Sequence, residues 1–309
     1  MEQNAKIYVA GHTGLIGSAV VRKLLSLGYC NIVTRTHQEM DLTGRKKVER
    51  FFEKENPEYV FLTAAKVGGI FANTTYPAEF IYINLSIQTN VIDLSYRYGV
   101  KKLVFFASSC IYPKMCQQPM KEEYFMTGPL EPTNEPFAVA KLAGWKMCQA
   151  YNRQYGTNFI TIIPANVYGT NDHFDEEGHV AASLIKRFHE AKVKREESVT
   201  IWGTGKPKRE FLYVDDLAEA CIFLMDKYDE SDAINVGTGN TITITELAEH
   251  IKIVTGFEGG ITYDTSKPDG NPVRLLDTSR IRALGWKPKT LLAEGLGITY
   301  RWYKESLSH

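Results

Sequence analysis

The first strand-like run of this chain leads directly into a glycine-rich turn. Lys6–Ala10 is mostly apolar, and Gly11, Gly14 and Gly17 follow at a spacing of three, where a helical pattern begins. A strand, a tight turn and a helix N-terminus form a site for phosphates, because free backbone N–H groups and the helix dipole favour anions. We therefore expect a dinucleotide here, against the simpler interpretation that the glycines serve only packing.

Apolar, β-rich runs alternate with helical patterns through the first half of the chain. The expected strands are Lys6–Ala10, Asn31–Thr34, Tyr59–Ala64, Lys102–Ala107 and Phe159–Pro164, and the expected helices are Leu15–Leu27, Pro77–Tyr98 and Pro136–Tyr155. Such alternation predicts a parallel sheet with helices on both faces, that is, an α/β fold with a Rossmann-type doubly wound sheet.

The regular alternation of expected strands and helices ends after Asn166. Segments rich in Gly, Asp and Pro then separate helical patterns at Asp216–Met225, Ile244–Thr255 and Leu292–Lys304. We expect a dinucleotide-binding domain at residues 1–166 and a smaller, mainly substrate-binding α/β domain at residues 167–309. Some segments of the second part, such as residues 233–237, are expected to return to the main sheet.

The composition limits the classes of binding partner that we expect for this chain. The 309 residues include 36 basic and 36 acidic side chains, so net charge gives no reason to expect nucleic acid or an anionic membrane. No apolar run approaches the roughly 20 residues that cross a bilayer, and the N-terminus lacks a signal-peptide pattern. Five scattered cysteines favour free thiols in the cytoplasm. No metal-ligand spacing appears among the histidines, cysteines and carboxylates, so no metal site is expected.

The end of the second strand indicates which dinucleotide binds. An acidic residue there favours NAD and a basic residue favours a 2′-phosphate. Arg35 therefore predicts NADP(H), although a solvated surface arginine is the alternative. The expected cofactor contacts along the glycine turn, after the second strand and after the third strand are Gly11, Thr13, Gly14, Leu15, Ile16, Gly17, Arg35, Asp41, Leu42, Ala64, Ala65 and Lys66.

Five longer strings resemble the extended short-chain dehydrogenase/reductase superfamily and, within it, the GDP-L-fucose synthase family. They are AKVGGI at 65–70, SSCIYP at 108–113, EPTNEP at 131–136, WGTGKPKREF at 202–211 and SKPDG at 266–270. The likeness runs from the first strand to the last helix. It implies an enzyme that epimerises a GDP-4-keto-6-deoxy sugar at C3 and C5 and reduces C4 with NADPH. It also implies a homodimer, commonly formed through two long helices.

The resemblance assigns catalytic roles. Cys110 and His179 would be the base and acid of the epimerisations, for which a thiol and an imidazole suit because both can be tuned near neutral pH. Ser108 would hydrogen-bond the carbonyl, and Lys141 would bind the nicotinamide ribose and hold charge near the oxyanion. By residue type alone, Cys110 is more typical of a buried filler and His179 of a surface or satisfied histidine.

The remaining binding residues follow from the same resemblance. Pro164, Asn166, Val167, Lys141 and His179 would lie around the nicotinamide. The GDP-sugar contacts would be Arg187, Trp202, Arg209 and Asp269, since an arginine can hold diphosphate oxygens in bidentate fashion. Solvated arginines and a core tryptophan are the alternatives at these positions.

One catalytic position departs from the family pattern. Phe137 stands four residues before Lys141, where the pattern has the tyrosine that donates the proton. Tyr and Lys at i and i+4 share a helix face, where the ammonium lowers the pKa of the phenol. Either one site of a working reductase was altered, or the natural protein has given up efficient reduction, or the chain is a regulator with an unused site. Tyr112 and Tyr168 are the first candidates for a substitute donor.

Competing functions remain open from the sequence. A related GDP-keto sugar, such as a heptose, would require only a different pocket size. UDP-sugar 4-epimerases share the superfamily, but Arg35 and the Cys110–His179 combination speak against them. A regulator that only binds NADP would have no need for the retained Cys110, Lys141 and His179.

Overall fold

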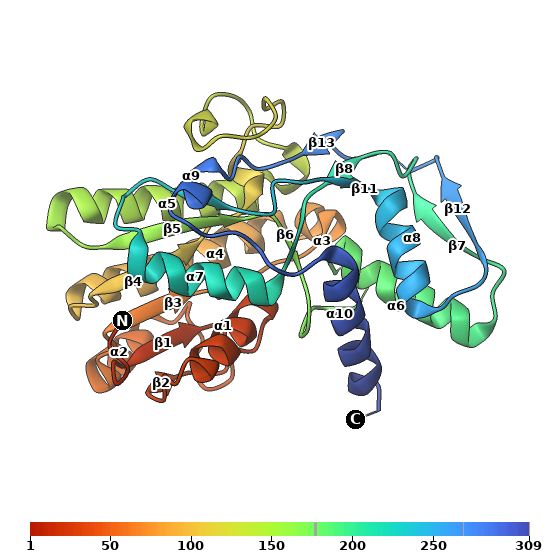
Figure 1. Ribbon diagram of the computed structural model, residues 1–309. Helices are drawn as coiled ribbons and strands as arrows, with labels where there is room; N and C mark the ends of the chain where they lie inside the picture. The colour runs from red at the N-terminus through yellow and green to blue at the C-terminus, as the bar shows by residue number, and fades with distance from the viewer. Residues whose placement is uncertain (176–177, 268, 309) are drawn as a thin grey trace.

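A computed structural model describes residues 1–175, 178–267 and 269–308. Its centre is a six-stranded parallel sheet with the order β10-β5-β4-β3-β1-β2 (Figure 1). The strands are β1 (Ile7–Ala10), β2 (Ile32–Val33), β3 (Tyr59–Leu62), β4 (Lys102–Phe106), β5 (Phe159–Pro164) and β10 (Ile234–Val236). The first five are nearly those that the sequence predicts, and the α/β prediction is confirmed.

Helices cover both faces of this sheet. On one face α1 packs against α7, and on the other α4 packs against α5 and α2 (Figure 1). The bounds are α1 (Leu15–Ser26), α2 (Arg45–Glu55), α3 (Ile70–Thr75), α4 (Pro77–Arg97), α5 (Glu135–Tyr155) and α7 (Val214–Lys227), with short 3-10 turns η1 (Ser109–Ile111), η2 (Glu122–Tyr124) and η3 (Pro132–Asn134). Among the described residues, no helix combines the length and apolar character needed to cross a membrane.

The order of the strands reverses next to β1, which pairs with β2 on one side and with β3 on the other. In an open α/β sheet, ligands bind beyond the carboxyl ends of the strands at such a reversal. The turn at residues 11–14 follows β1, and residues 63–66 follow β3. The topology therefore brings the two predicted cofactor segments to one place.

The second part of the chain adds small sheets beside the main one. β6 (Asn166–Tyr168) pairs with β9 (Phe211–Tyr213), β7 (Ser198–Trp202) with β12 (Gly260–Asp264), and β8 (Lys208–Arg209) with β11 (Ile242–Thr243) and β13 (Val273–Arg274). The helices are α6 (Val180–Lys194), α8 (Ile244–Thr255), α9 (Ser279–Ala283) and α10 (Leu292–Ser306); α6, α8 and α10 lie together beyond the end of the main sheet (Figure 1). β10 pairs with β5 in parallel, as expected for the returning segment, whereas the division at residue 166 stays a prediction.

The sequence analysis does not predict α2, α3, α6 or α9, of which α2 and α6 are the longest. α2 is so rich in charge that only one narrow stripe, Val48, Phe51 and Phe52, is buried. α6 buries Leu184, Ile185 and Phe188, among others, at helical spacing. That spacing is present in the sequence, but it follows directly on a polar loop that is rich in Gly and Asp. α6 matters for the site because it carries Arg187 and begins directly after His179.

Candidate active site

The glycine turn has the shape that a diphosphate requires. Gly11 has a φ of +89°, and a Cβ added at Gly17 would lie 2.1 Å from the carbonyl oxygen of Gly11, so both positions need glycine. Gly14 is the N-cap of α1, and no side chain within the described part of the chain caps the helix. The first-turn N–H groups of α1 are thus left without a side-chain partner, and the turn fits the phosphates of a dinucleotide.

The loop after β3 closes against this turn. A Cβ at Gly11 would lie 2.7 Å from the backbone nitrogen of Ala64, so the two loops are in close contact. Ala65 follows, and Lys66 is fixed at both ends: its N–H donates to Asn84 Oδ1 at 3.0 Å, and its Nζ pairs with Glu79 at 2.7 Å. These residues lie at the strand-order reversal, where a dinucleotide groove is expected.

Arg35 lies just beyond β2 and has protein partners. Its Nη2 is 2.7 Å from Glu55 Oε1, and its Nη1 donates to the Thr34 carbonyl at 2.6 Å. Its guanidinium also lies 5.3 Å from the centre of the Phe51 ring. Arg35 is therefore held in place rather than freely solvated. Its contact with a 2′-phosphate stays a prediction, as do the cofactor contacts of Asp41, which accepts from the Thr43 N–H at 2.9 Å, and of buried Leu42.

Lys141 is buried, with its ammonium group at the end of β4. Its Nζ donates to the Phe106 carbonyl at 2.9 Å and lies 5.0 Å from the centre of the Phe105 ring. Burial lowers the pKa of Lys141 to about 8, and the neighbouring Cys110 acts in the opposite direction. Ser108, just after β4, accepts a long hydrogen bond of 3.4 Å from the Cys110 N–H. The predicted carbonyl-binding and ribose-binding groups therefore lie close together.

Phe137 occupies the same face of α5 as Lys141, one turn earlier. Lys141 Nζ is 5.8 Å from the centre of the Phe137 ring. The ring also packs edge-on against Phe80, with centroids 6.3 Å apart. The position that the family pattern gives to a proton donor thus holds a hydrocarbon ring beside a buried ammonium group.

Neither tyrosine suggested as a substitute donor is suited to the task. The Tyr112 hydroxyl is fully buried and donates to Asn235 Oδ1 at 2.8 Å. The Tyr168 hydroxyl donates to the Leu292 carbonyl at 3.4 Å, and this ring is also buried. Burial raises the pKa of both phenols well above the usual value of 10. Both hydroxyls hydrogen-bond to other segments of the chain, which speaks against either tyrosine as the substitute donor.

Cys110 combines burial with nearby positive charge. Its side chain belongs to the main hydrophobic core. Burial raises the pKa of its thiol, while the Ser108 hydroxyl and the cations of Arg274 and Lys141 lower it. Arg274 comes from β13 and donates from Nη1 to the Ser109 carbonyl at 2.8 Å. The filler interpretation explains the burial but not the two cations.

Arg274 escaped the sequence analysis. It lies 165 positions from Ser109 in the chain, and nothing in its local sequence marks it as functional. Only the pairing of β13 with β8, in register with Arg209, brings it to the thiol.

His179 stands at the N-terminus of α6, in the loop that follows β6. Its Nδ1 lies 3.1 Å from Asp172 Oδ1, and this hydrogen bond raises the pKa of His179 above the usual 6.5. Asn171 Nδ2 donates to the Thr13 carbonyl at 2.8 Å, so the loop is fastened to the glycine turn. His179 is therefore neither a core histidine nor an isolated one on the surface. Glu176 and Glu177, between these residues, lie outside the described residues.

The residues expected beside the nicotinamide lie at the end of β5 and the start of β6. Pro164 is the last residue of β5, and Asn166 begins β6. Asn166 donates to the Glu210 carbonyl from its backbone N at 3.2 Å and from Nδ2 at 2.8 Å, while Val167 is buried. Their contacts with a nicotinamide stay predictions.

The predicted GDP-sugar residues lie on the small sheets and α6. Trp202 is 67% exposed, which excludes a core tryptophan. Asp269 accepts from the backbone N of Thr204 at 2.9 Å and from its hydroxyl at 2.7 Å. Arg209 donates to the Asn271 carbonyl at 2.6 Å, and Arg187 donates to the carbonyl of Thr200. Both arginines are therefore anchored by backbone carbonyls.

Glu210 connects the segments around the predicted GDP-sugar residues. The carboxylate is 1% exposed and accepts from the N–H groups of Gly239 at 2.7 Å and Leu276 at 2.9 Å. Burial raises its pKa, and these backbone donors act against the rise. It therefore joins three segments beside Arg209, a function that its place in the string at 202–211 does not reveal.

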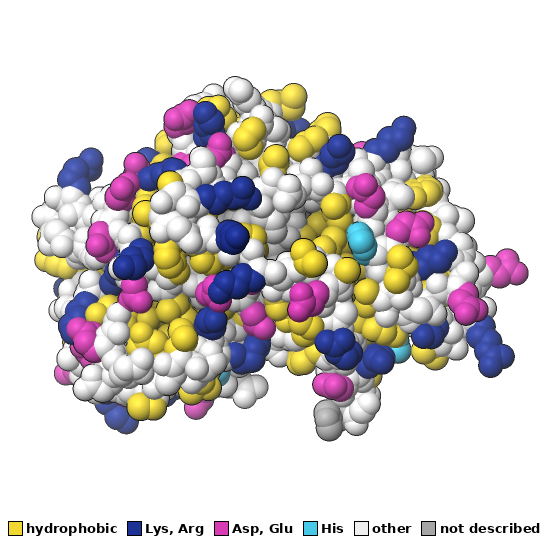
Figure 2. Space-filling model, in the orientation of Figure 1, with side chains coloured by type: hydrophobic (Ala, Val, Ile, Leu, Met, Phe, Trp, Pro, Cys, Tyr) yellow, Lys and Arg dark blue, Asp and Glu magenta, His cyan; other side chains and the backbone are white. Residues whose placement is uncertain are grey.

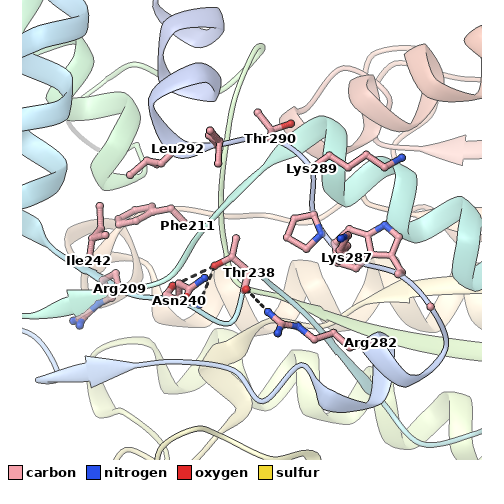
Figure 3. Close-up of a pocket in the computed structure, with 14 residues that line it drawn as sticks. Arg209, Phe211, Thr238, Asn240, Ile242, Arg282, Lys287, Lys289, Thr290 and Leu292 are labelled. Atoms are coloured by element: carbon pink, nitrogen blue, oxygen red, sulfur yellow. Dashed lines mark hydrogen bonds between the residues drawn. The ribbon is translucent and has the colours of Figure 1, made fainter.

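A cavity of about 570 Å³ lies on the face that carries α7, and of the predicted GDP-sugar residues only Arg209 is among its described lining residues. It is lined by Arg209, Phe211, Arg282 and Lys289, among others, and by none of the predicted catalytic residues. The Arg209 guanidinium points away from the other lining residues (Figure 3). Lys and Arg side chains gather over the middle of this face (Figure 2).

Comparison with known proteins places the chain in a family. Residues 7–237 match the model of the NAD dependent epimerase/dehydratase family, and the chain belongs to that family. It is 56% identical to a putative GDP-L-fucose synthase 2 of Arabidopsis thaliana, over 99% of this chain and 94% of that protein. It is 46% identical to the GDP-L-fucose synthase of Escherichia coli K12, with 97% of each chain covered.

A solved structure extends the comparison. The GDP-D-glycero-L-gluco-heptose synthase of Campylobacter jejuni, crystallised in the presence of NADPH, superposes with a TM-score of 0.93. It is 41% identical, covering 98% of this chain and 99% of its own. The overall arrangement described above is therefore that of a nucleotide-sugar enzyme family.

Proposed function

We propose that this chain is an NADPH-dependent 3,5-epimerase/4-reductase of a GDP-4-keto-6-deoxy sugar, of the GDP-L-fucose synthase type, with reduction weakened by Phe137. The observation that carries the proposal is the acid–base set: a thiol beside two cations, and an imidazole bonded to a buried carboxylate on the loop fastened to the glycine turn. Full-length similarity to GDP-L-fucose synthases supports the substrate class.

Epimerisation uses Cys110 and His179. A proton beside a ketone is acidic enough for a thiolate to remove, which leaves an enolate. The cations of Arg274 and Lys141 favour the thiolate against the effect of burial. Protonated His179 then returns a proton to the opposite face of the ring. Repetition at the second carbon inverts both centres.

The cofactor segments fit NADP(H). The uncapped start of α1 would hold the diphosphate, and Arg35 would meet the 2′-phosphate beside its present partner Glu55. Bound NADPH supplies a hydride for C4. Lys141 would hold the nicotinamide ribose and stabilise negative charge on the C4 oxygen, and Ser108 would donate a hydrogen bond to that oxygen.

Reduction lacks its proton donor. Phe137 has no hydroxyl, and the loss of a positioned general acid typically costs about 10²- to 10⁴-fold in rate. The ring keeps nearly the shape of tyrosine, so binding of cofactor and sugar should persist. The chain would thus exchange C3 and C5 protons efficiently and consume NADPH slowly.

The second part of the chain would bind the GDP-sugar. Arg187 and Arg209 would hold diphosphate oxygens, Trp202 would offer a flat, exposed face, and Asp269 would accept hydrogen bonds. The proposed division is cofactor binding by residues 1–166 and mainly substrate binding by residues 167–309. A related GDP-keto sugar such as a heptose is the second candidate, favoured by the likeness to the Campylobacter jejuni heptose synthase.

We also propose a cytoplasmic homodimer that pairs through α4 and α5. The two helices pack along each other, and they expose Tyr82, Tyr96 and Tyr155. A mass near twice the 34.9 kDa of the chain in analytical ultracentrifugation would support the dimer, and a monomer at micromolar concentration would exclude it.

Incubation with GDP-4-keto-6-deoxymannose and NADPH in heavy water tests the main proposal. Deuterium should enter C3 and C5, as followed by NMR, while NADPH absorbance falls slowly. Absence of deuterium from both carbons together with rapid NADPH oxidation would refute the proposal. A parallel incubation with a GDP-4-keto-heptose separates the two substrate candidates by rate.

A further inference from the structure

Asp172 is the carboxylate that bonds to His179 in the proposed acid–base set, but the proposed function gives Asp172 no role of its own. Its carboxylate is 1% exposed. Oδ1 accepts from the His173 N–H at 2.9 Å and lies 3.1 Å from His179 Nδ1. Oδ2 is buried and has no hydrogen-bond partner among the residues that the structure describes. A buried carboxylate is costly unless it is paired, so its principal side-chain partner, the imidazole, deserves an explanation.

The loop is built to bring these two residues together. Asn171 has a φ of +71° and is anchored to the glycine turn through Thr13. At the other end, a Cβ at Gly178 would lie 2.1 Å from the His173 carbonyl oxygen. The two ends of the loop can approach only because residue 178 is glycine.

His179 is the N-cap of α6, yet its side chain does not cap the helix. Nδ1 faces Asp172 instead, and 54% of the side chain remains exposed. With Nδ1 occupied, Nε2 is the nitrogen left for a ligand. A carboxylate that accepts from one imidazole nitrogen fixes the tautomer and the orientation of the ring.

We propose that Asp172 is a positioning residue for His179, one that holds the Nδ1–H and presents Nε2 as the proton donor. This inference rests on the proposed function. Cys110 thiolate removes the carbon-bound proton and becomes a thiol, while His179 imidazolium transfers its Nε2 proton to the enolate carbon and becomes neutral with Nδ1–H retained. Exchange of protons with solvent restores both groups. The raised pKa of His179 agrees with this role.

Two measurements on Asp172→Ala test the proposal. The first is the rate of deuterium incorporation at C3 and C5, which should fall about 10- to 100-fold, while the sugar concentration at half-maximal rate changes less than about threefold. The second is the ¹⁵N spectrum of histidine-labelled protein, with the His179 signal assigned by its loss in His179→Asn. Nδ1 should be the protonated nitrogen in the unaltered chain, and this preference should be lost in Asp172→Ala.

Further variants separate positioning from folding. Asp172→Asn keeps the size and one acceptor oxygen, so its exchange rate should lie between those of the unaltered chain and Asp172→Ala. Gly178→Ala changes neither side chain but forces the loop ends apart, and it should imitate Asp172→Ala. Asp175→Asn, the same substitution at an exposed site in the same loop, should leave both measurements unchanged.

The outcomes are distinct. Unaltered exchange in Asp172→Ala overturns the proposal, as does slow exchange with an unchanged imidazole tautomer. If the unaltered chain fails to exchange C3 and C5 protons, the proposed function fails. The spectra then decide alone: loss of the Nδ1–H preference in Asp172→Ala upholds the positioning role, and its retention overturns it.

Discussion

In the proposed mechanism, the reducing and the epimerising halves of the site differ in completeness. On the reducing side, Lys141 keeps its hydrogen bond and its buried position, but it faces the hydrocarbon ring of Phe137. On the epimerising side, Cys110 has Arg274 nearby, and His179 has Asp172. One half has lost the group that its cation would serve, whereas the other has a partner for each reactive side chain.

If the proposed roles hold, a single fold separates the two chemistries by placing them on different elements. Phe137 and Lys141 belong to α5, while Cys110 follows β4 and His179 begins α6. Because different elements hold the two sets, loss of one hydroxyl on α5 leaves the thiol and the imidazole in place. Four predictions test how far the two halves are independent.

Phe137→Tyr should have the largest effect. Restoring a phenol beside the buried Lys141 ammonium should raise the rate of NADPH oxidation about 10²- to 10⁴-fold, with deuterium exchange at C3 and C5 changed little. Stopped-flow absorbance measures the first quantity and NMR the second. Phe137→Leu is the control, since it changes the ring without adding a hydroxyl and should remain slow. An equally slow Phe137→Tyr would mean that another group donates the proton.

Cys110→Ser should affect the other half. A serine hydroxyl is a far weaker acid than a thiol, so deuterium exchange should fall about 100-fold or more. Binding of NADPH, measured by fluorescence, should be unaffected. Cys116→Ser alters a half-buried thiol that also lies near Arg274, and it serves as the matched control. Exchange that survives in Cys110→Ser but not in Cys116→Ser would move the base to Cys116.

Arg35→Ala should weaken NADPH binding about 10- to 100-fold, because hydrogen bonds to a charged group are worth about 1.5 to 3 kcal/mol. The same variant should bind NADH as before, since NADH lacks the 2′-phosphate. Calorimetric titration with both dinucleotides provides the comparison. An equal loss for NADPH and NADH would assign Arg35 to the fold, through Glu55, rather than to the phosphate.

The smallest of the four expected effects is that of Lys141→Met on the free energy of unfolding. The pKa of Lys141 falls from the usual 10.5 to about 8 on folding, so below pH 8 a buried charge destabilises the native state. Removing the charge relieves this destabilisation, and the lost hydrogen bond offsets about 1 kcal/mol of the gain. The free energy of unfolding should therefore rise by about 2 kcal/mol at pH 7.

The pH dependence provides the check on that value. Between about pH 8 and 10.5 the native lysine is neutral and the unfolded one still charged, so the unaltered chain gains stability as pH rises and the gap to Lys141→Met narrows. Urea unfolding of both proteins at several pH values measures this difference in stability. A gap that is constant with pH would mean that the lysine keeps its usual pKa.

Local patterns in the sequence suffice for some of this architecture. The alternation of apolar runs predicts the parallel sheet, and the glycine spacing predicts the turn after β1, because both depend on residues close together in the chain. The partners of the functional groups are not predictable in this way. Arg274 reaches Ser109 across 165 positions, and Glu55 reaches Arg35 across 20. Such pairs are set by strand pairing and helix packing, which a single sequence does not display.

The return of β10 to the main sheet affects how the chain folds while the ribosome is still synthesising it. The strand nearest to β10 in space, β5, ends at Pro164, yet β10 begins only at Ile234. During synthesis the edge of β5 therefore stays unpaired until about seventy further residues have been added. A fragment ending at residue 166 would carry that open edge permanently, so we expect it to aggregate more readily than the whole chain.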